Sequence, residues 1–363
     1  MATEQLTLGA MLDEEAIEDG SDDESMTLPA NYDVMTFGAD MPVDGLVKRL
    51  EEGNIYIPEF QRGYVWSQER ASRFVESLLI GLPTPTIFLW RDEDKRLVVI
   101  DGQQRLRSIQ YFCSGSFKGK PTFALKGVRD DMQGLTYDTL GPEQKRTLDD
   151  SLLHAFIVRQ EEPTDDHSSI YHVFERLNSG MTPLYPHEIR NCLYQGQFVD
   201  LLQELNSDDD WRDIFGARHS RMKDQELILR VTALYHASGG YEEPMKQFLN
   251  DFLKRHRNFG AGISRATVHE TFVRSIRAIH GAVGNDAFKP HGRLNAAVFD
   301  GVMIGVATRL AKADITDAAG LRAKYDALLT DSDFLATTDQ ATTNQNTVLS
   351  RLEMGIEAFQ DAV

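Results

Sequence analysis

The sequence predicts an α+β protein, with a mixed α/β domain over residues 34–162 and an all-helical region over residues 163–363. Up to about residue 160, short β-branched runs alternate with segments of helical hydrophobic period, as in a sheet covered by helices. After Pro163 every apolar pattern has the helical period, and no internal repeat is apparent. A chain of 363 residues has room for two such domains.

The first 33 residues form an acidic segment that we expect to be a disordered tail. Residues 1–33 contain ten Asp or Glu and no Lys or Arg, so they account for −10 of the net charge of −18 and leave −8 for the rest. A solubilising tail is the favoured interpretation, and a nucleic-acid mimic that guards a basic groove is the alternative. The acidic remainder argues against strong nonspecific DNA binding by this chain alone.

The composition favours a cytoplasmic protein without a membrane partner. The two cysteines, Cys113 and Cys192, lie in apolar helical patterns that are typical of buried thiols in a reducing compartment. No apolar run reaches the length of a membrane span. The acidic start lacks the basic region of a signal peptide.

Local signals place the elements of the N-terminal domain. Ser67 is typical of a helix N-cap, the apolar residues after it recur at helical spacing, and Gly81 ends the pattern. Pro83 and Pro85 then exclude a helix before the next β-branched run. The expected elements are a helix over 43–53, an extended segment over 55–60, a helix over 67–81, strands over 86–90 and 96–100, a helix to about 112, a short strand near 123–125, a helix over 142–149 and a strand over 152–158.

The second region carries apolar stripes at helical spacing throughout. Asp165 or Asp166 is suited to cap its first helix. The expected helices cover residues 168–177, 198–205, 225–238, 244–257, 267–283, 294–310, 320–330 and 347–359.

The most informative segment is Asp101-Gly102-Gln103-Gln104-Arg105, which follows the β-branched run 97–100 and opens a helical pattern. A strand that turns into a helix leaves backbone N–H groups and a positive dipole end facing outward, which is a ready anion site. Here the turn also supplies a carboxylate, two carboxamides and a guanidinium. The alternative is an ordinary turn in which Asp101 caps the helix.

A second cluster, IPEFQRGYVW at 57–66, brings another Gln and Arg out of an extended segment among aromatic residues. Together with SLLIGLPTPTIFLW, VVIDGQQRLRSIQYF and FERLNSGMTPLYPHEIR, it strongly resembles the N-terminal domain of GmrSD-type restriction enzymes over roughly residues 40–310. The resemblance implies a ParB/sulfiredoxin-like fold that binds nucleotides at a comparable strand-to-helix Arg motif. It also implies a role in nucleotide-dependent restriction of modified phage DNA.

Arg62 and Arg105 are the candidate phosphate ligands. Arginine presents a planar fork of donors that matches phosphate oxygens and remains charged at any relevant pH. Two such residues beside a helix N-terminus would bind a nucleoside triphosphate and stabilise charge during phosphoryl transfer. The alternative is that either residue pairs with an acid such as Glu59 or Asp101.

The other turn residues have candidate catalytic or binding roles. Asp101 could hold Mg²⁺ or orient an attacking water, and Gln103 or Gln104 could position that water. Gly102 would let backbone N–H groups approach the phosphates closely, and Gln61 is the partner from the upstream cluster.

Five further residues of these blocks are candidates for binding or support of the site. The resemblance places Asn178 with the other motifs, where it could contact base or ribose, although it could equally satisfy carbonyls at a helix end. Glu188 and Arg190 are expected to form a structural ion-pair network that supports the site. Tyr64 and Trp66 could stack on a base, but aromatic residues at this spacing are more often part of a core.

Many relatives carry an HNH nuclease after the helical region, and this sequence departs from them because Asp166-His167 lacks the later His and Asn that such a nuclease needs. This departure puts DNA cleavage by this polypeptide in doubt and leaves nucleotide binding untouched. Separately, the sequence has no HExxH motif, zinc-type cysteine spacing or Walker A loop.

Three functions are therefore considered. The first is a Mg²⁺-dependent NTPase of an anti-phage restriction system that senses or remodels DNA with a separate nuclease or effector protein. The second is a DNA-binding or regulatory module that keeps the fold without turnover. The third is a nuclease that uses the 101–105 turn itself, which the acidic body makes the least favoured.

Overall fold

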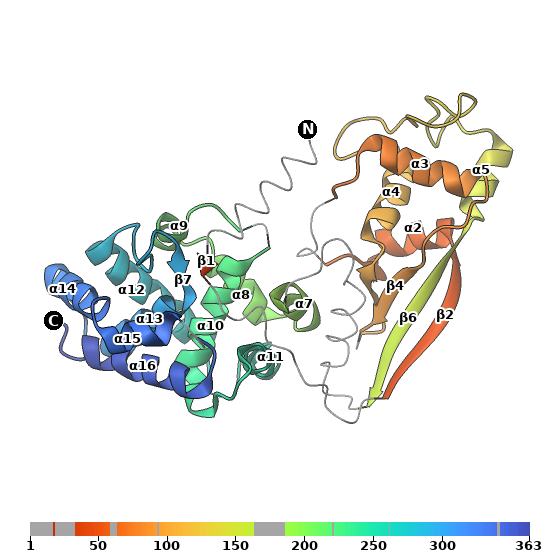
Figure 1. Ribbon diagram of the computed structural model, residues 1–363. Helices are drawn as coiled ribbons and strands as arrows, with labels where there is room; N and C mark the ends of the chain where they lie inside the picture. Colours follow the sequence, from red (N-terminus) through yellow and green to blue (C-terminus); the bar gives the residue numbers. More distant parts are fainter. Residues whose placement is uncertain are drawn as a thin grey trace. The chain divides into compact units, whose positions relative to one another are not determined.

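The computed structural model describes residues 17–18, 33–58, 64–92, 94–162, 186–219, 221–260, 262–339 and 342–363 (Figure 1). The chain forms two compact units: a sheet unit within residues 28–184, and a helical unit that comprises residues 1–27 and 185–363. The predicted α+β class is confirmed, because a mixed sheet with helices is followed by a succession of helices. The predicted domain boundary at 162/163 adjoins residues 163–185, which lie outside the described ranges.

The sheet unit contains a five-stranded mixed sheet with the strand order β2-β6-β4-β5-β3. These strands are β2 (Asp33–Pro42), β6 (Leu152–Glu162), β4 (Ile87–Arg91), β5 (Leu97–Asp101) and β3 (Ile55–Tyr56). The β2–β6 and β4–β5 pairs are antiparallel, whereas β4–β6 and β3–β5 are parallel. The predicted strands near 86–90, 96–100 and 152–158 are thus confirmed.

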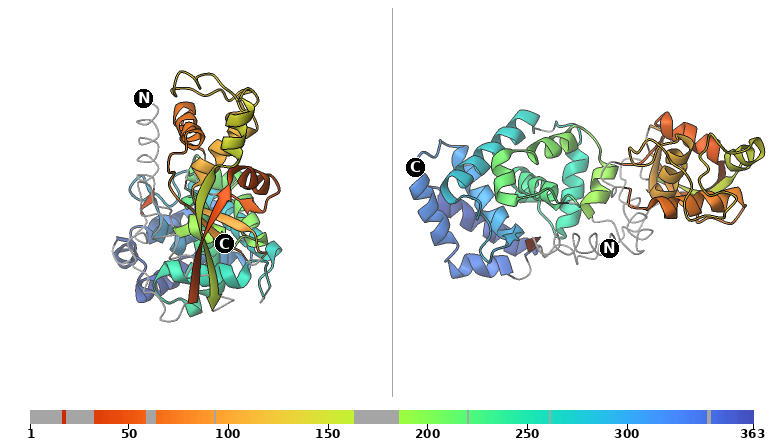
Figure 2. Two further views of the ribbon diagram at one scale, coloured as in Figure 1. Left: turned by 90° about the vertical axis from the view of Figure 1, so that its right-hand side faces the viewer. Right: turned by 90° about the horizontal axis from the view of Figure 1, so that it is seen from above.

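Strand β2 was not predicted, since Gly, Asp and Pro are depleted in strands. It forms because it pairs with β6 along its whole length, from Asp33 opposite Glu162 to Pro42 opposite Leu152. Only 155–158 of β6 also pair with β4, so the two long strands continue beyond the sheet as a twisted ribbon (Figure 2, left). The short strand expected near 123–125 is wrong, because that segment is in no strand.

Four helices, α2 (Val43–Glu51), α3 (Gln68–Leu79), α4 (Gln103–Cys113) and α5 (Pro142–Asp149), agree with the predicted positions to within a few residues. Ser67 caps α3 as expected, because its hydroxyl accepts a hydrogen bond from the backbone N–H of Arg70. The helices pack on the sheet face formed by alternate strand residues. That face consists of Ile87, Leu89, Leu97, Val99, Leu153, Ala155 and Ile157.

In its described residues the helical unit consists of helices apart from two short strands, β1 (Ile17–Glu18) and β7 (Leu294–Asn295), which pair in parallel. The helices are α7 (Pro186–Leu193), α8 (Gln197–Leu205), α9 (Asp209–Phe215), α10 (Lys223–Ala237), η1 (Ser238–Gly240), α11 (Met245–His256), α12 (Arg265–Val283), α13 (Ala296–Leu310), α14 (Ala318–Leu328), α15 (Ser332–Asp339) and α16 (Gln345–Phe359). The predicted helices that fall within the described ranges are confirmed, whereas α7, α9 and α15 were missed. No helix in these ranges combines the length and apolar character needed to cross a membrane.

Helix α13 forms the centre of the helical unit and is buried on nearly every side. It approaches α16 so closely that a Cβ atom at Gly305 would lie 2.2 Å from the carbonyl oxygen of Gly355. One charged residue, Asp300, is fully buried on this helix. Its carboxylate lies 2.7 Å from Arg230 Nη2 and 3.0 Å from Arg351 Nη2, and both arginines are themselves buried.

Replacing Asp300 with Asn is expected to destabilise the protein by about 3–5 kcal/mol, because it leaves two buried guanidinium groups without their shared counter-charge. The measurement is urea unfolding followed by circular dichroism. Asp326→Asn is the matched control, since the Arg322–Asp326 pair on α14 is half-exposed and such pairs contribute about 0.2–1 kcal/mol. If Asp300→Asn and Asp326→Asn lost equal amounts of unfolding free energy, the buried Asp300 carboxylate would not be an important counter-charge for Arg230 and Arg351.

Candidate functional site: the turn from strand β5 to helix α4

The candidate site begins where β5 ends at Asp101 and α4 starts at Gln103. The residue between them, Gly102, is the helix N-cap and has φ +107°, in the left-handed region that favours glycine. The first backbone hydrogen bond of the helix runs from Leu106 N–H to the Gly102 carbonyl, 2.9 Å away. The positive end of the helix dipole therefore lies at this turn.

Gly102 is required for packing as well as for its backbone conformation. A Cβ atom at this position would lie 2.5 Å from Cγ2 of Ile87, the first residue of the adjacent strand β4. Because the cap position has no side chain, the alternative in which Asp101 caps the helix is wrong. The turn thus brings bare backbone close to strand β4.

Arg105 is held at the turn by two hydrogen bonds from a single nitrogen. Its Nη2 donates to Oδ2 of Asp101 over 2.7 Å and to the carbonyl oxygen of Thr86 over 3.1 Å. Its side chain is 14% exposed, whereas that of Asp101 is 48% exposed. The predicted alternative of an Arg105–Asp101 ion pair is confirmed. Nε of Arg105 is buried without a hydrogen-bond partner, so the guanidinium retains donor capacity beyond this pair.

Gln103 and Gln104 are both buried in the first turn of α4, at 7% and 8% exposure. The Gln104 carboxamide oxygen accepts hydrogen bonds from the backbone N–H groups of Val65 and Trp66, at 3.0 and 3.3 Å. This side chain therefore joins the upstream cluster to the helix that carries Arg105.

Tyr64 and Trp66 make core contacts, which was the favoured interpretation. The Tyr64 hydroxyl lies 2.6 Å from Ser108 Oγ, and its ring packs edge-on against Tyr111 and Phe117. Burial raises the pKa of Tyr64 to about 12, so the phenol remains protonated. The Trp66 ring packs edge-on against that of Phe74, and both aromatic residues contact the hydrophobic core of the sheet unit.

Glu59, Gln61, Arg62 and Asn178, which the sequence analysis considered, lie outside the described residues. The structure therefore brings together Asp101, Gly102, Gln103, Gln104 and Arg105 of the predicted set.

The expected ion pairs of Glu188 and Arg190 are confirmed, and they lie in the helical unit. Arg190 is fully buried on α7 and contacts Glu226 Oε1 at 3.0 Å, while Arg221 Nη1 lies 3.9 Å from Glu188. The sequence analysis missed His187, whose Nδ1 lies 2.8 Å from the second oxygen of Glu226. Glu226 is more than thirty residues from α7 in the sequence, so its contacts with His187 and Arg190 could not be predicted from spacing along the chain.

Both ring nitrogens of His187 face acceptors, because Nε2 contacts the carbonyl oxygen of Arg221. A ring with two acceptors is a double donor and therefore an imidazolium. Burial by itself would lower the pKa of His187, but the Glu226 carboxylate outweighs burial and raises that pKa above its ordinary value.

A divalent metal would find one protein ligand at the turn. In the described ranges no three His, Cys, Asp or Glu side chains are grouped as metal ligands. Asp101 is half-exposed and has a second carboxylate oxygen beside the one that Arg105 holds. One carboxylate together with substrate phosphates and water is a usual way of binding Mg²⁺.

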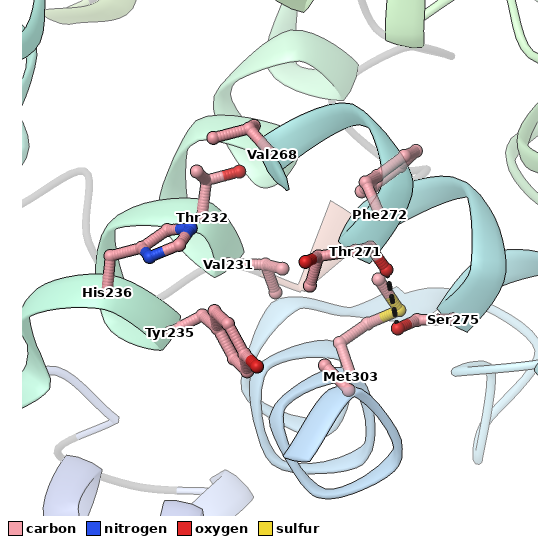
Figure 3. A pocket seen from close by; sticks show the side chains of 10 residues that line it. Val231, Thr232, Tyr235, His236, Val268, Thr271, Phe272, Ser275 and Met303 are labelled. Carbon is pink, nitrogen blue, oxygen red and sulfur yellow. Dashed lines mark hydrogen bonds between the residues drawn. The ribbon is translucent and has the colours of Figure 1, made fainter. Parts of the chain in front are cut away.

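The helical unit also contains a small pocket between α10, α12 and α13 (Figure 3). Its empty space, which includes open solvent at the mouth, is about 260 Å³. Its lining is mostly apolar, with His236, Tyr235 and Ser275 among the polar side chains. None of these residues was predicted as a site, so the candidate site remains the turn at Gly102.

The fold and the turn together define an α+β protein in which a strand ends at the N-terminus of a helix. Residues 43–195 match the family described as the GmrSD restriction endonuclease, N-terminal domain. The predicted resemblance is thereby confirmed over that range and not over the whole of 40–310.

A curated relative is an uncharacterized protein of Methanocaldococcus jannaschii. It is 31% identical over 107 residues, an alignment that covers 23% of this chain and 18% of the relative. The chain thus spans less than a fifth of that protein's length.

Gly102→Ala is expected to destabilise the sheet unit by about 1–3 kcal/mol, through backbone strain and the contact with Ile87. Gly115→Ala is the matched control, since Gly115 also has positive φ (+76°) but nothing within 4 Å of an added Cβ. The free energy of unfolding in urea is measured for both variants. Both suffer the backbone strain, but only Gly102→Ala suffers the contact with Ile87, so the difference between them gives the cost of that contact. A loss at Gly102 no larger than that at Gly115 would show that the approach to Ile87 is unimportant.

The raised pKa of His187 predicts a pH dependence of stability. Its contribution is complete below the unfolded pKa of about 6.5 and is lost as the pH rises through the higher folded pKa. The urea midpoint, measured from pH 6 to 9, should therefore fall less steeply for His187→Gln than for the wild type. The control is His291→Gln on an exposed loop, which removes no buried ion pair. If the urea midpoints of the wild type and His187→Gln fell equally with pH, His187 would not have a raised pKa in the folded protein.

Proposed function

We propose that the turn at Gly102 binds the phosphate groups of a nucleoside triphosphate. The observation that carries the proposal is the arrangement of Gly102 and Arg105. Gly102 opens α4 at the positive end of the helix without adding a side chain, and Arg105 is fixed beside it with unused donor capacity. Backbone amides, a helix dipole and a guanidinium are the groups that recur in phosphate sites.

The proposed activity is Mg²⁺-dependent hydrolysis of the bound nucleotide. Arg105 would stabilise charge on the transferred phosphoryl group, and the free oxygen of Asp101 would hold Mg²⁺ against the phosphates. Gln103 is the remaining candidate to position water. From the resemblance, Gln61 and Arg62 would add phosphate contacts, and Asn178 would contact base or ribose.

The domain family connects such a nucleotide site with restriction or defence. We propose that nucleotide binding and hydrolysis change the conformation of the protein, which acts on DNA together with a separate nuclease or effector. The net charge of −18 supports the need for a separate nuclease or effector that contacts DNA, because an acidic chain alone attracts DNA weakly.

A second candidate, a regulatory module that binds without turnover, is favoured by one observation. Three of the four proposed catalytic groups already make structural contacts: Asp101 and Arg105 are paired with each other, and the Gln104 oxygen accepts two backbone N–H groups. A carboxylate that neutralises a guanidinium is a weak base. This candidate predicts nucleotide binding with hydrolysis at background.

Phosphate release from ATP, GTP, CTP and UTP with Mg²⁺ tests the proposal. Arg105→Ala should abolish release and weaken binding by roughly 10- to 100-fold, which corresponds to the loss of a charge-assisted contact. Arg105→Lys should restore little, because an ammonium lacks the planar fork. The matched control is Arg96→Ala, because the Arg96 side chain is 44% exposed and pairs with Asp92; this variant should leave release unchanged.

Release that persists in Arg105→Ala would place the site elsewhere. Binding without release in the wild type would favour the regulatory module. Neither binding nor release of any of the four nucleotides, with or without DNA, would overturn the proposed function.

A further inference from the structure

One row of residues crosses the sheet from the end of β5. The strand registers place Asp101 of β5 opposite Phe88 of β4. They also place Phe88 beside Phe156 of β6, and Phe156 opposite Gly38 of β2. Strands β4, β6 and β2 are neighbours in the sheet (Figure 1). Because paired residues direct their side chains to the same face of a sheet, two aromatic rings lie in the row that begins at Asp101.

A shift of one residue in the register brings Asp101 into this row. Leu89 pairs with Val99, so regular pairing would place Ile100 opposite Phe88, but Phe88 pairs with Asp101. Two residues of β5 thus stand opposite one residue of β4, which is the arrangement of a β-bulge, and a bulge can redirect a side chain. The proposed Mg²⁺ ligand is therefore the neighbour of an aromatic residue.

Phe88 and Phe156 form a stacked pair, which we call the aromatic platform. Their ring centroids are 5.6 Å apart and their planes are inclined by 29°. Leu89 and Ile157, the residues that follow them, belong to the hydrophobic core under the helices. Since side chains alternate along a strand, both rings point to the opposite face of the sheet. Both aromatic residues are only partly buried, so they retain ring surface on which a further aromatic ring can pack.

The proposed phosphate ligand lies close to the platform. Arg105 Nη2 donates to the carbonyl oxygen of Thr86 over 3.1 Å and to Asp101 over 2.7 Å. Thr86 precedes Phe88 by two residues, so their Cα atoms lie within about 7 Å of each other. Asp101 is the register partner of Phe88. Both groups that hold the Arg105 guanidinium are thus adjacent to Phe88, and a nucleotide bound there can place its base on the platform.

The far end of the platform is unsuited to phosphate. The His154 ring packs edge-on against Phe156 with centroids 5.0 Å apart, and its Nδ1 lies 2.7 Å from Oδ1 of Asp40. A carboxylate at this end, in a chain of net charge −18, repels the phosphates of a nucleic-acid strand that crosses both rings. A single base whose phosphates remain at Arg105 avoids this repulsion, so the favoured occupant is the base of one nucleotide.

We propose that the aromatic platform of Phe88 and Phe156 binds the base of the nucleotide whose phosphates contact the turn at Gly102. The proposal rests on the proposed nucleotide function and deepens it, because it assigns the residues that hold the base. Every base has a π face, so stacking accepts all of them. The platform therefore adds affinity for a nucleotide over a triphosphate without a base, and it discriminates little among the four bases.

Substitutions at the two rings separate stacking from apolar packing. Phe88→Leu and Phe156→Leu keep an apolar side chain but remove the ring, whereas Phe88→Tyr keeps the ring. The matched control is Phe37→Leu, because Phe37 is a 37% exposed phenylalanine of the same sheet that pairs with the core residue Ile157 and so points to the helix-covered face. The urea midpoint of each full-length variant establishes that it is folded.

Binding is measured by titration calorimetry with Mg²⁺. The ligands are the β,γ-imido analogues of ATP, GTP, CTP and UTP, and that of methyl triphosphate, which has the same phosphates but no base. The wild type should bind the nucleotide analogues about 5- to 100-fold more tightly than the methyl triphosphate analogue, the range expected for base–aromatic stacking. Phe88→Leu and Phe156→Leu should each remove a large part of this difference and leave the affinity for the methyl triphosphate analogue unchanged. Phe88→Tyr and Phe37→Leu should bind every ligand as the wild type does.

Three results would overturn the proposal. Equal affinity of the wild type for the nucleotide and methyl triphosphate analogues would show that the base is not bound. Unchanged nucleotide affinity in Phe88→Leu and Phe156→Leu would show that the base lies elsewhere. An equal rise in Kd for both kinds of ligand in Phe88→Leu would make Phe88 a structural residue of the sheet.

The same titrations separate this proposal from the proposed function. Arg105→Ala should weaken both kinds of ligand, because the phosphates are common to them. Nucleotide binding that is lost in Phe88→Leu but retained in Arg105→Ala would support the platform and overturn the phosphate site. If the wild type bound neither kind of ligand, both proposals would be overturned.

Discussion

The close approach of Gly102 to Ile87 is the constraint on which the sheet unit depends. Because no Cβ fits between β4 and the start of α4, the helix begins immediately after β5, with its positive end at the edge of the sheet. Arg105 then reaches back over one turn to Asp101 and to the carbonyl of Thr86. A helix that began a turn later would leave the guanidinium without either contact.

Gln104 extends this arrangement to a distant part of the chain. Its oxygen satisfies two backbone N–H groups that would otherwise be costly to bury, and the Tyr64–Ser108 contact adds a second attachment. The proposed phosphate site is therefore supported by residues that do not face a ligand. In the helical unit, buried charges such as Asp300 and Glu226 play a comparable part, since each is shared by two cationic side chains.

Local patterns were sufficient for most elements. The helical stripe behind Ser67, the β-branched runs of β4 and β5 and the stripes after residue 186 predicted elements to within a few residues, because burial of one face imposes the period. Strand β2 could not be predicted, since its Gly38, Asp40 and Pro42 have low strand propensity and its partner β6 is more than one hundred residues away. The short helices α7, α9 and α15 were missed because they carry too few turns for a clear stripe.

The sequence by itself determined the class of fold, the family of the N-terminal domain and the position of the strand-to-helix turn, because motif residues and hydrophobic periods are local properties. Tertiary structure decided what the turn residues do. It made Gly102 the N-cap in place of Asp101, paired Asp101 with Arg105, and used Gln104 to hold Val65 and Trp66. The reason is physical: a hydrogen bond or ion pair depends on which groups the fold brings within about 3 Å, and spacing along the chain does not contain that information.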